Sequence, residues 1–592
     1  MTRRPVRIGN FSGYLGDRRS ALADVLAGDP VDVLVGDYLA EFTLAMLASR
    51  HRADPSKGYV EYFLDQLGPQ LGAVAERGCR VVANAGGFHP AGLAEAVRAL
   101  AAARGVRLRV AHVEGDDVLP ELDRLRADGH ALAHLDTGAP LSDWGVRPIA
   151  ANAYLGGWGI AAALRAGADV VVCGRVTDAS LTAGPAAWWH GWDPADWDRL
   201  AAAVVAGHVI ECGPHATGGN FSGFTAVPGA VEPGFPVAEI AADGTAVITK
   251  HTGHGGMVTA DTVTAQLVYE IQGPRYLNPD VTAHLDTVRL RTIGPDRVEL
   301  SGVTGSPPPP TTKVAAFAPI GHQVVHTLYA TGLAVEEKVA LVRAQVAALL
   351  GERPDVEVDV TALGVPAVDP RTQWEATAQI RVMAAGPDPE PLDDLVQGLG
   401  GLFLSSIPGF YTDTAARQAS TARPRIDYWP ALLAVEAVPH RVVLDGGERL
   451  GVPPPAATAE QAQPVHPEPG PPSPGPTRRL PLGALAHARS GDKGGNSNVG
   501  LWVPDPRAWP WLRDLLSTAG LRRLMPEAAD VEVVRHEFPE LRAVHFVLRG
   551  LLGTGGSSNL RVDPIGKAVG EYLRARHVDV PVDLTGAIAP PP

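Results

Sequence analysis

Side chains that can move protons or hold an anion follow five short apolar segments in the first 230 residues of the chain. The segments are rich in β-branched residues, and glycine also occurs beside most of the polar positions. The polar residues and glycines are Asp37 after 31–35; Asn84, Gly86, Gly87 and His89 after 80–83; Glu114, Asp116 and Asp117 after 108–113; Arg175 and Asp178 after 169–173; and Glu211, Cys212 and His215 after 208–210. Ligands of open α/β sheets bind at the carboxyl ends of the strands. We therefore predict that these residues line one pocket, where glycine lets a ligand approach the backbone.

Arg175 is the residue best suited to hold an anion. It follows a buried apolar segment directly and precedes a predicted helix, a place where a guanidinium can bind a carboxylate or phosphate. The alternative is an ion pair with Asp178 in the same loop, and Asp178 could itself cap the helix at 179–188. Both interpretations fit the sequence.

Glu211 and Asp116 are the candidates for a general base. A carboxylate base, an acid and an anion holder such as Arg175 are what hydration, dehydration or C–C cleavage next to a carbonyl requires. Glycine-rich backbone at 84–87 and at Gly218 and Gly219 would line the same site. The alternative is that these loops are polar only because they connect strands to helices.

Two further groupings allow other chemistry. Cys212 and His215 could form a thiol–base pair, although a small buried cysteine is the commoner case. His112, Glu114 and Asp116 alternate along the chain and have the residue types of a metal site. A metal-dependent hydrolase is therefore a weaker alternative, and we predict no bound metal.

Two glycine-rich segments near the C-terminus, 488–500 and 550–573, also carry polar residues suited to binding. Asp492, Lys493 and Asn496 lie among the glycines of the first segment. Backbone N–H groups together with lysine favour an anion. The alternative is a sheet with glycine bends, but glycine at this density is entropically costly for turns alone, and we predict a functional loop.

The elements that must position these residues change along the chain. Over 1–230, apolar β-branched segments alternate with Ala/Leu-rich helical segments, which predicts an α/β fold with a parallel sheet flanked by helices. Residues 231–450 predict an α+β region with hairpins at 237–251 and 284–303 and helices at 259–271, 335–350 and 393–405. The Pro-rich stretch 451–479 predicts an extended linker. Residues 480–592 predict a small α+β sandwich, with strands at 485–488, 498–503, 530–537 and 543–549.

Composition narrows the class of protein. The chain has 592 residues, 45% of them hydrophobic, and a formal net charge of −14, which argues against a nucleic-acid partner. Three widely spaced cysteines exclude a disulfide framework. The first residues lack the apolar core of a signal peptide, and no stretch is long and apolar enough to span a membrane. We therefore expect a cytoplasmic protein.

Several long segments resemble the acyclic terpene utilisation (AtuA) family. They are VVCGRVTDASLTAGPAAW, GHVIECGPHATGGNFSGF, MVTADTVTAQLVYEIQGPRYLNPDV, ARSGDKGGNSNVGLW and GTGGSSNLRVDPIGK. The resemblance runs along nearly the whole chain and implies an AtuA core followed by an AtuA-like ferredoxin-fold domain at 480–592. The family takes its name from bacterial breakdown of citronellol and geraniol, whose intermediates are branched acyl-CoA thioesters.

The resemblance therefore implies a catabolic enzyme acting on an acyl-CoA thioester or a related branched carboxylate, with hydratase- or lyase-type chemistry. No cofactor is predicted beyond the CoA moiety of the substrate. We expect an anionic small-molecule ligand and a homo-oligomer. The alternative is a module that binds acyl-CoA, or assembles with a partner enzyme, without catalysis.

Overall fold

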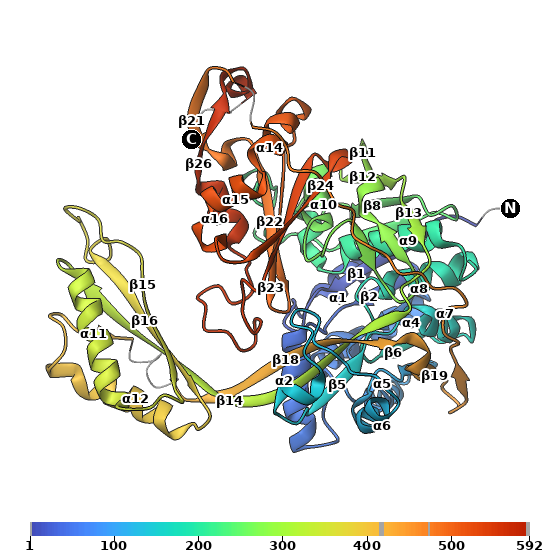
Figure 1. Ribbon diagram of the computed structural model, residues 1–592. Helices are drawn as coiled ribbons and strands as arrows, with labels where there is room; N and C mark the ends of the chain where they lie inside the picture. The colour runs from blue at the N-terminus through green and yellow to red at the C-terminus, as the bar shows by residue number, and fades with distance from the viewer. Residues whose placement is uncertain (1–2, 414–419, 472–473, 588–592) are drawn as a thin grey trace.

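A mixed sheet of eleven strands runs through the larger, N-terminal body of the protein (Figure 1). The computed structural model describes residues 3–413, 420–471 and 474–587. Five central strands are parallel, in the order β1 (Val6–Ser12), β2 (Val33–Gly36), β3 (Arg80–Ala83), β6 (Val170–Cys173) and β4 (Val110–Glu114). Nearly all of their residues are buried, as expected for apolar strands covered on both faces.

Antiparallel strands extend this sheet on both sides. β7 (Pro236–Ile240), β8 (Ala246–Lys250), β12 (Arg297–Ser301) and β11 (Arg289–Gly294) follow beyond β1, and β19 (Arg441–Val443) and β20 (Arg449–Gly451) follow beyond β4. The two predicted hairpins are confirmed as β7–β8 and β11–β12. The parallel strands predicted within 1–230 therefore form the centre of a larger mixed sheet, whose antiparallel edge strands come from residues 236–451.

Helices pack against both faces of the sheet. Successive residues of each strand belong to two different hydrophobic clusters, as Val33 and Leu34 show. One cluster includes α7 (Trp158–Arg165), α8 (Ser180–His190) and α9 (Trp197–Ile210); the other includes α1 (Ala21–Ala27), α2 (Glu41–Ala53), α3 (Glu61–Leu67), α4 (Leu71–Arg77) and α5 (Pro90–Ala103).

Residues 208–210, predicted as a strand, instead form the last turn of α9. The helix is buried from Leu200 to Ile210, so it lacks the polar face that marks an amphipathic helix in a sequence. In the sequence, the valines and the isoleucine near its end therefore have the pattern of a buried strand.

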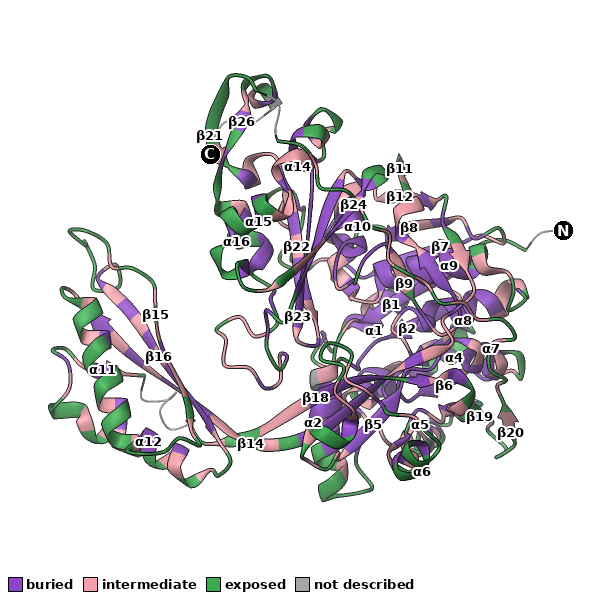
Figure 2. Cartoon of the chain, in the orientation of Figure 1, coloured by how far each residue is buried: buried purple, intermediate pink, exposed green. Residues whose placement is uncertain are grey.

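A long two-stranded arm leads from the body to a separate outer lobe, which we define as residues 332–422 (Figure 1). β14 (Thr311–Thr331) pairs with β5 (Ala150–Ala153) at the body, with β18 (Arg423–Ala434) along the arm, and with β16 (Thr377–Gly386) and β17 (Tyr411–Thr412) at the lobe. β15 (Glu357–Leu363), α11 (Val335–Leu350) and α12 (Glu390–Gly401) complete the lobe, and Figure 2 shows the outer sides of its two helices exposed.

The C-terminal domain has an antiparallel sheet in the order β22 (His487–Lys493), β23 (Asn496–Trp502), β25 (Ala543–Arg549) and β24 (Glu532–Phe538). α14 (Trp509–Leu515), α15 (Thr518–Leu524) and α16 (Val569–Ala575) accompany the sheet, and β21 (Thr477–Pro481) pairs with β26 (His577–Pro581). The segment predicted as a loop at 489–497 is a tight hairpin, with Gly494 and Gly495 in its turn.

Smaller elements lie between these units. They are α6 (Leu122–Ala127), α10 (Ala260–Leu267) and the sheet of β9 (Arg275–Leu277), β10 (Thr282–His284) and β13 (Thr304–Ser306). Between 452 and 476 the described residues form neither helix nor strand, but the segment packs on the protein, since Gln463 exchanges two hydrogen bonds with the backbone of Arg275. Among the described residues, no helix has the length and apolar character needed to cross a membrane.

Candidate functional site

A cavity of about 400 Å³ lies where the body, the arm, the linker and the C-terminal domain meet, and we call it the composite cavity. The residues around it include Tyr154, Arg175, Thr177 and Asp178 of the body, the segment 270–279, Thr311–Lys313 and Tyr428 of the arm, Glu460, Gln461 and Gln463 of the linker, and Lys493, Gly494, Asn496 and Arg549 of the C-terminal domain. The site is therefore built from segments that are far apart in the sequence.

Arg175 lies in the wall of the composite cavity, at the carboxyl end of β6. Its guanidinium lies 4.1 Å from the centre of the Tyr154 ring, and Nη1 donates to the Leu39 carbonyl at 2.7 Å and to Asp178 Oδ1 at 2.6 Å. The ion pair considered as an alternative is therefore present. The Arg175 Nε, although buried, has no hydrogen-bond partner among the described residues, so the guanidinium retains an unused donor.

Asp116 holds the loop that carries Arg175. Its Oδ2 accepts hydrogen bonds from the backbone N–H of Arg175 at 2.7 Å and from Asn152 Nδ2 at 2.9 Å. A Cβ atom at Gly174 would lie 2.4 Å from Asp116 Oδ1, so only glycine fits there. Burial raises the pKa of Asp116 to about 6. Asp116 does not line the cavity, and its contacts are those of a residue that positions Arg175.

Asp37 and Asn84 form a buried pair next to this loop. Asn84 Nδ2 donates to Asp37 Oδ1 at 2.6 Å, and Asn84 Oδ1 accepts from the backbone N–H of Tyr38 at 2.7 Å. Burial, and then the neighbouring Asp178 carboxylate, raise the pKa of Asp37. The loops after β2, β3 and β6 therefore do come together, as the sequence predicts for neighbouring parallel strands.

Glu211 forms a buried dyad with His208 at the end of α9. The His208 Nδ1 and Glu211 Oε1 atoms are 3.0 Å apart, and the two side chains are 1% and 9% exposed. Burial and Asp178 raise the pKa of Glu211, and burial lowers the pKa of His208 to about 4. The His208 ring lies 4.9 Å from that of Tyr276, which lines the cavity. The dyad is thus directly behind the cavity wall.

The environment of Cys212 disfavours a thiolate nucleophile. Burial, and then the charge of Glu211, raise the pKa of the Cys212 thiol. His215 accepts a hydrogen bond at Nδ1 from Arg489 at 2.8 Å, and burial lowers its pKa to about 3. Neither side chain has the electrostatic setting that an activated cysteine requires.

The C-terminal domain contributes two lysines that meet Glu270 of the body. Lys567 Nζ donates to Glu270 Oε1 at 2.6 Å, and Lys493 Nζ lies 3.8 Å from Glu270 Oε2. Burial alone would raise the pKa of Glu270, but Lys567 and Lys493 lower it to about 2. Lys493 makes no hydrogen bond to another described residue through Nζ, so its charge is only partly engaged. Glu270 also has a left-handed backbone, with φ of 51°.

Two other polar residues of the β22–β23 hairpin lie in or beside the cavity. Asn496 Nδ2 donates to Asp136 Oδ1 at 2.7 Å, which joins the hairpin to the body. Asp492 lies 3.8 Å from Lys567, and burial together with Glu270 raises its pKa to about 7. Asn496 lines the cavity, whereas Asp492 does not.

The arm adds a cation and aromatic surface. Lys313 Nζ lies 3.1 Å from Glu41 Oε1 and 4.9 and 5.4 Å from the ring centres of Tyr154 and Tyr428. The apolar lining residues are Leu135, Leu277, Pro279, Pro309, Pro430 and Leu432. The cavity thus combines charged groups with an apolar surface, a composition suited to an amphipathic ligand.

The four glycines predicted to line the site instead serve close packing. A Cβ at Gly86 would lie 2.5 Å from the Cys173 carbonyl oxygen, and one at Gly87 would lie 2.3 Å from a backbone oxygen. Gly218 has φ of 104°, and Gly219 packs on the Pro214 carbonyl. None of the four lines the composite cavity, so their need for glycine is explained by the protein backbone itself.

The residues considered for a metal site do not converge. His112 Nε2 lies 3.6 Å from Glu114 Oε2, but the Asp116 carboxylate points to the Arg175 backbone. Across residues 3–413, 420–471 and 474–587, no cluster of three or more His, Cys, Asp or Glu side chains could hold a metal ion.

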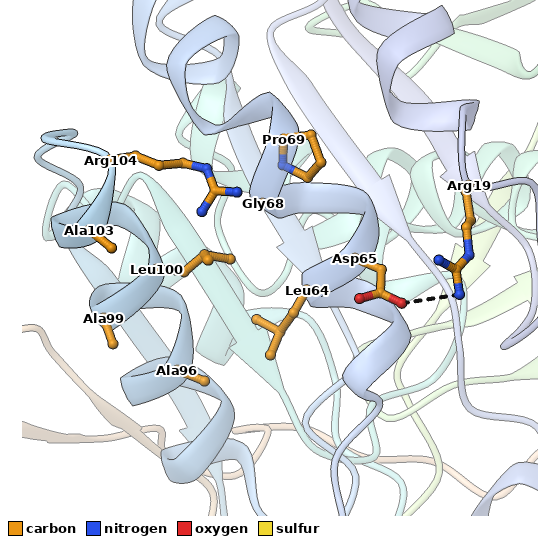
Figure 3. Close-up of a pocket in the computed structure, with 10 residues that line it drawn as sticks. All are labelled: Arg19, Leu64, Asp65, Gly68, Pro69, Ala96, Ala99, Leu100, Ala103 and Arg104. Atoms are coloured by element: carbon orange, nitrogen blue, oxygen red, sulfur yellow. Dashed lines mark ion pairs between the residues drawn. The ribbon is translucent and has the colours of Figure 1, made fainter.

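Another hollow, of about 660 Å³, lies between α3 and α5 (Figure 3). Its floor is apolar, with Leu64 and Leu100, and its rim carries the Arg19–Asp65 ion pair at 3.3 Å. Both ionisable side chains are more than half exposed. The hollow therefore presents no desolvated charge comparable to Arg175, and the composite cavity is the better candidate.

Several cavity residues gave no signal in the sequence. Glu270, Tyr276, Lys313 and Tyr428 line the cavity but lie in segments without a glycine-rich loop or a strand-to-helix junction. They reach the cavity only because the arm and the segment 270–279 pack against the body. Tyr154 differs from these four, because the glycine-rich loop 155–159 follows it directly.

Comparison with known families gives two matches. Residues 6–444 match the acyclic terpene utilisation family protein AtuA, and residues 480–579 match the AtuA ferredoxin-like domain. No curated protein and no solved structure matches the chain. The resemblance expected from the sequence is therefore confirmed.

Proposed function

The chain belongs to the acyclic terpene utilisation family, and from that premise we propose that it binds an acyl-CoA thioester or related branched carboxylate in the composite cavity and acts on it next to the carbonyl group. The observation that carries the proposal is the placement of two cationic side chains, Arg175 and Lys493, beside an apolar wall in one cavity. A branched acyl chain fits the apolar wall, and a thioester or carboxylate oxygen fits the cations.

The proposed polar contacts come from two sides of the cavity. Arg175 offers its guanidinium from the body, and Lys493 offers Nζ from the C-terminal domain. Asp178 fixes the orientation of the guanidinium through its bond to Nη1, and Asn496 fixes the hairpin through Asp136. A ligand bound here would touch both parts of the chain.

We further propose Glu211 as the proton-transferring carboxyl group and Asp116 as the residue that positions Arg175. Glu211 Oε2 has no hydrogen-bond partner among the described residues, and its raised pKa suits a group that must both take and return a proton. Asp116 has its Oδ2 engaged by two donors.

Titration calorimetry with a CoA thioester of a branched unsaturated acid, the free acid and CoA alone tests the binding part. Arg175→Lys should weaken binding of the thioester roughly tenfold or more, because lysine cannot reproduce the planar donor pattern. Arg80→Lys is the matched control: Arg80 pairs with Asp169 at the amino end of β3, on the opposite edge of the sheet.

Absence of binding to the wild-type protein, or equal loss in both variants, would contradict the proposal. Mass analysis of the bound thioester then tests the chemistry. Conversion supports an enzyme, and recovery of unchanged thioester supports a non-catalytic acyl-CoA-binding module.

A further inference from the structure

A group of buried polar atoms without partners surrounds the His208–Glu211 dyad. Among the described residues, Asn10 Oδ1, His208 Nε2, Glu211 Oε2 and both side-chain polar atoms of Gln266 are buried and make no hydrogen bond. Asn10, His208 and Gln266 are at most 1% exposed. A buried polar atom left unsatisfied costs on the order of 1–3 kcal/mol, so a cluster of five in one place calls for an occupant.

Contacts place these residues close to one another. Asn10 Nδ2 donates to the Glu211 carbonyl at 3.2 Å, and His208 contacts Glu211 through Nδ1. Gln266 lies on α10, which packs against α9, and its amide lies beside Cys212. The four residues come from β1, from α9 or its C-terminal end, and from α10.

The unpartnered atoms select the chemistry of the occupant. Asn10 Oδ1 and Gln266 Oε1 can only accept hydrogen bonds, Gln266 Nε2 can only donate, and the free atoms of His208 and Glu211 do either according to their protonation. Carbonyl and carboxyl acceptors repel an anion, whereas a water molecule or hydroxyl group satisfies donors and acceptors together. This site therefore differs in kind from the cationic groups of the composite cavity.

We propose that Asn10, His208, Glu211 and Gln266 bind one water molecule, and that the His208–Glu211 dyad activates this water for addition to an unsaturated thioester in the composite cavity. The water site stands on the geometry alone; the reaction rests on the proposed function above. Tyr276 is shared by the two sites, because its ring contacts His208 and also lines the cavity.

The addition balances without any further reactant. An O–H bond of the water breaks, and its proton passes to the dyad while the oxygen forms a C–O bond with the β-carbon of the thioester. The π electron pair of the C=C bond forms a C–H bond at the α-carbon with a proton returned by the dyad. The product is the β-hydroxy thioester, and the dyad is regenerated.

Crystallography of the full chain, at a resolution that shows ordered water, tests the site itself. We expect one water within hydrogen-bonding distance of Glu211 Oε2 and the Gln266 amide. Gln266→Leu should remove that water without raising the melting temperature, because the loss of a satisfied amide offsets the gain in apolar packing. A wild-type crystal structure without this water, together with a raised melting temperature in Gln266→Leu, would overturn the proposal.

The catalytic part is tested with His208→Asn and the thioester that binds the wild-type protein. We expect the Kd to stay within about twofold while formation of the hydrated product falls at least 100-fold, the usual loss on removing a general base. His545→Asn is the control, since His545 is also fully buried but lies in the C-terminal sheet. Unchanged turnover in His208→Asn would refute the role of the dyad. Failure of the wild-type protein to bind any thioester would instead refute the proposed function, and the water site would then be decided by the crystallographic experiment alone.

Discussion

Replacing Glu270 with glutamine should loosen the C-terminal domain from the body. The Glu270 carboxylate accepts a hydrogen bond from Lys567 and lies near the ammonium group of Lys493, and these two charges lower its pKa from 4.5 to about 2. At roughly 1.4 kcal/mol for each tenfold change in proton affinity, this lowering of the Glu270 pKa corresponds to about 3 kcal/mol of stabilisation from its charge. Because the folded pKa is depressed, this contribution is complete above pH 4.5 and is lost as the pH falls towards 2.

Hydrogen exchange followed by mass spectrometry measures this effect where it should occur. At pH 7, Glu270→Gln should speed exchange in the hairpin 487–502 by about 100-fold, the equivalent of about 3 kcal/mol in local opening. The body strands should keep their wild-type protection. The difference between variant and wild type should shrink between pH 4.5 and 2.

The matched control is Glu532→Gln in the same domain. Glu532 lies 3.5 Å from Arg549, but its side chain is 66% exposed, and such surface pairs contribute little. We expect no change in hairpin protection. Equal exchange in Glu270→Gln and wild type, within a factor of about three, would show that the two lysines do not hold the domain through Glu270.

Three further predictions follow from single contacts. Gly86→Ala should lower the stability by about 1–3 kcal/mol, seen as a lower melting temperature, because its Cβ would lie 2.5 Å from the Cys173 carbonyl oxygen. Burial lowers the pKa of His545 to about 3, so below pH 6.5 the unfolded chain binds a proton that the folded chain does not. The free energy of unfolding of the wild-type protein should therefore fall more steeply with decreasing pH than that of His545→Asn. The difference should reach up to about 1.4 kcal/mol for each pH unit and is measured by denaturant titration. Arg381→Ala should increase exchange in 550–563, since Arg381 Nη1 donates to the Leu560 carbonyl at 2.8 Å.

Controls for these variants come from the same chain. Gly72→Ala meets no atom within 4 Å and lies in α4, so it should leave the stability unchanged or raise it slightly. His577→Asn changes an exposed histidine, and Arg353→Ala removes an exposed lobe arginine that pairs with Asp355. If a control reproduces the effect of its partner, the contact named above is not the cause.

The elements with clear periodicity or strong apolar character were predictable from the sequence. The helix at 335–350 is found with those bounds because its polar and apolar residues alternate with helical period. Four of the five central strands, β2, β3, β4 and β6, were predictable because short β-branched segments between Ala/Leu-rich helices have few alternatives. The buried helix α9 was not, because a helix without a polar face loses its periodicity.

The arm could not be read from the sequence. Pro319 and Gly321 fall in the middle of β14, and both residue types indicate the end of a strand. In the structure they coincide with an irregularity in the β14–β18 register, so the strand continues past them. Without the arm, the positions of Lys313 and Tyr428 could not be inferred.

Two parts of the candidate site were predictable: the residues that one sheet edge collects, and Lys493 and Asn496 of the glycine-rich segment 488–500. Arg175 and Asp178 line the cavity, and Asp116 and Asn84 lie next to them, as neighbouring strand ends require. Lys493 depends on the docking of a separate domain. The distance between Lys493 and Arg175 is set by the packing of that domain on the body, which the local sequence pattern does not encode.

β14 pairs with strands of both the body and the outer lobe, and this couples the position of the lobe to the cavity wall. The ladder that begins at the lobe with Thr331 continues without a connecting loop to Lys313 and Thr312, which line the cavity. A ribbon of paired strands transmits twist along its length, whereas a flexible hinge would absorb it. A partner that binds the lobe and twists it would therefore also displace Thr312 and Lys313 in the wall of the composite cavity.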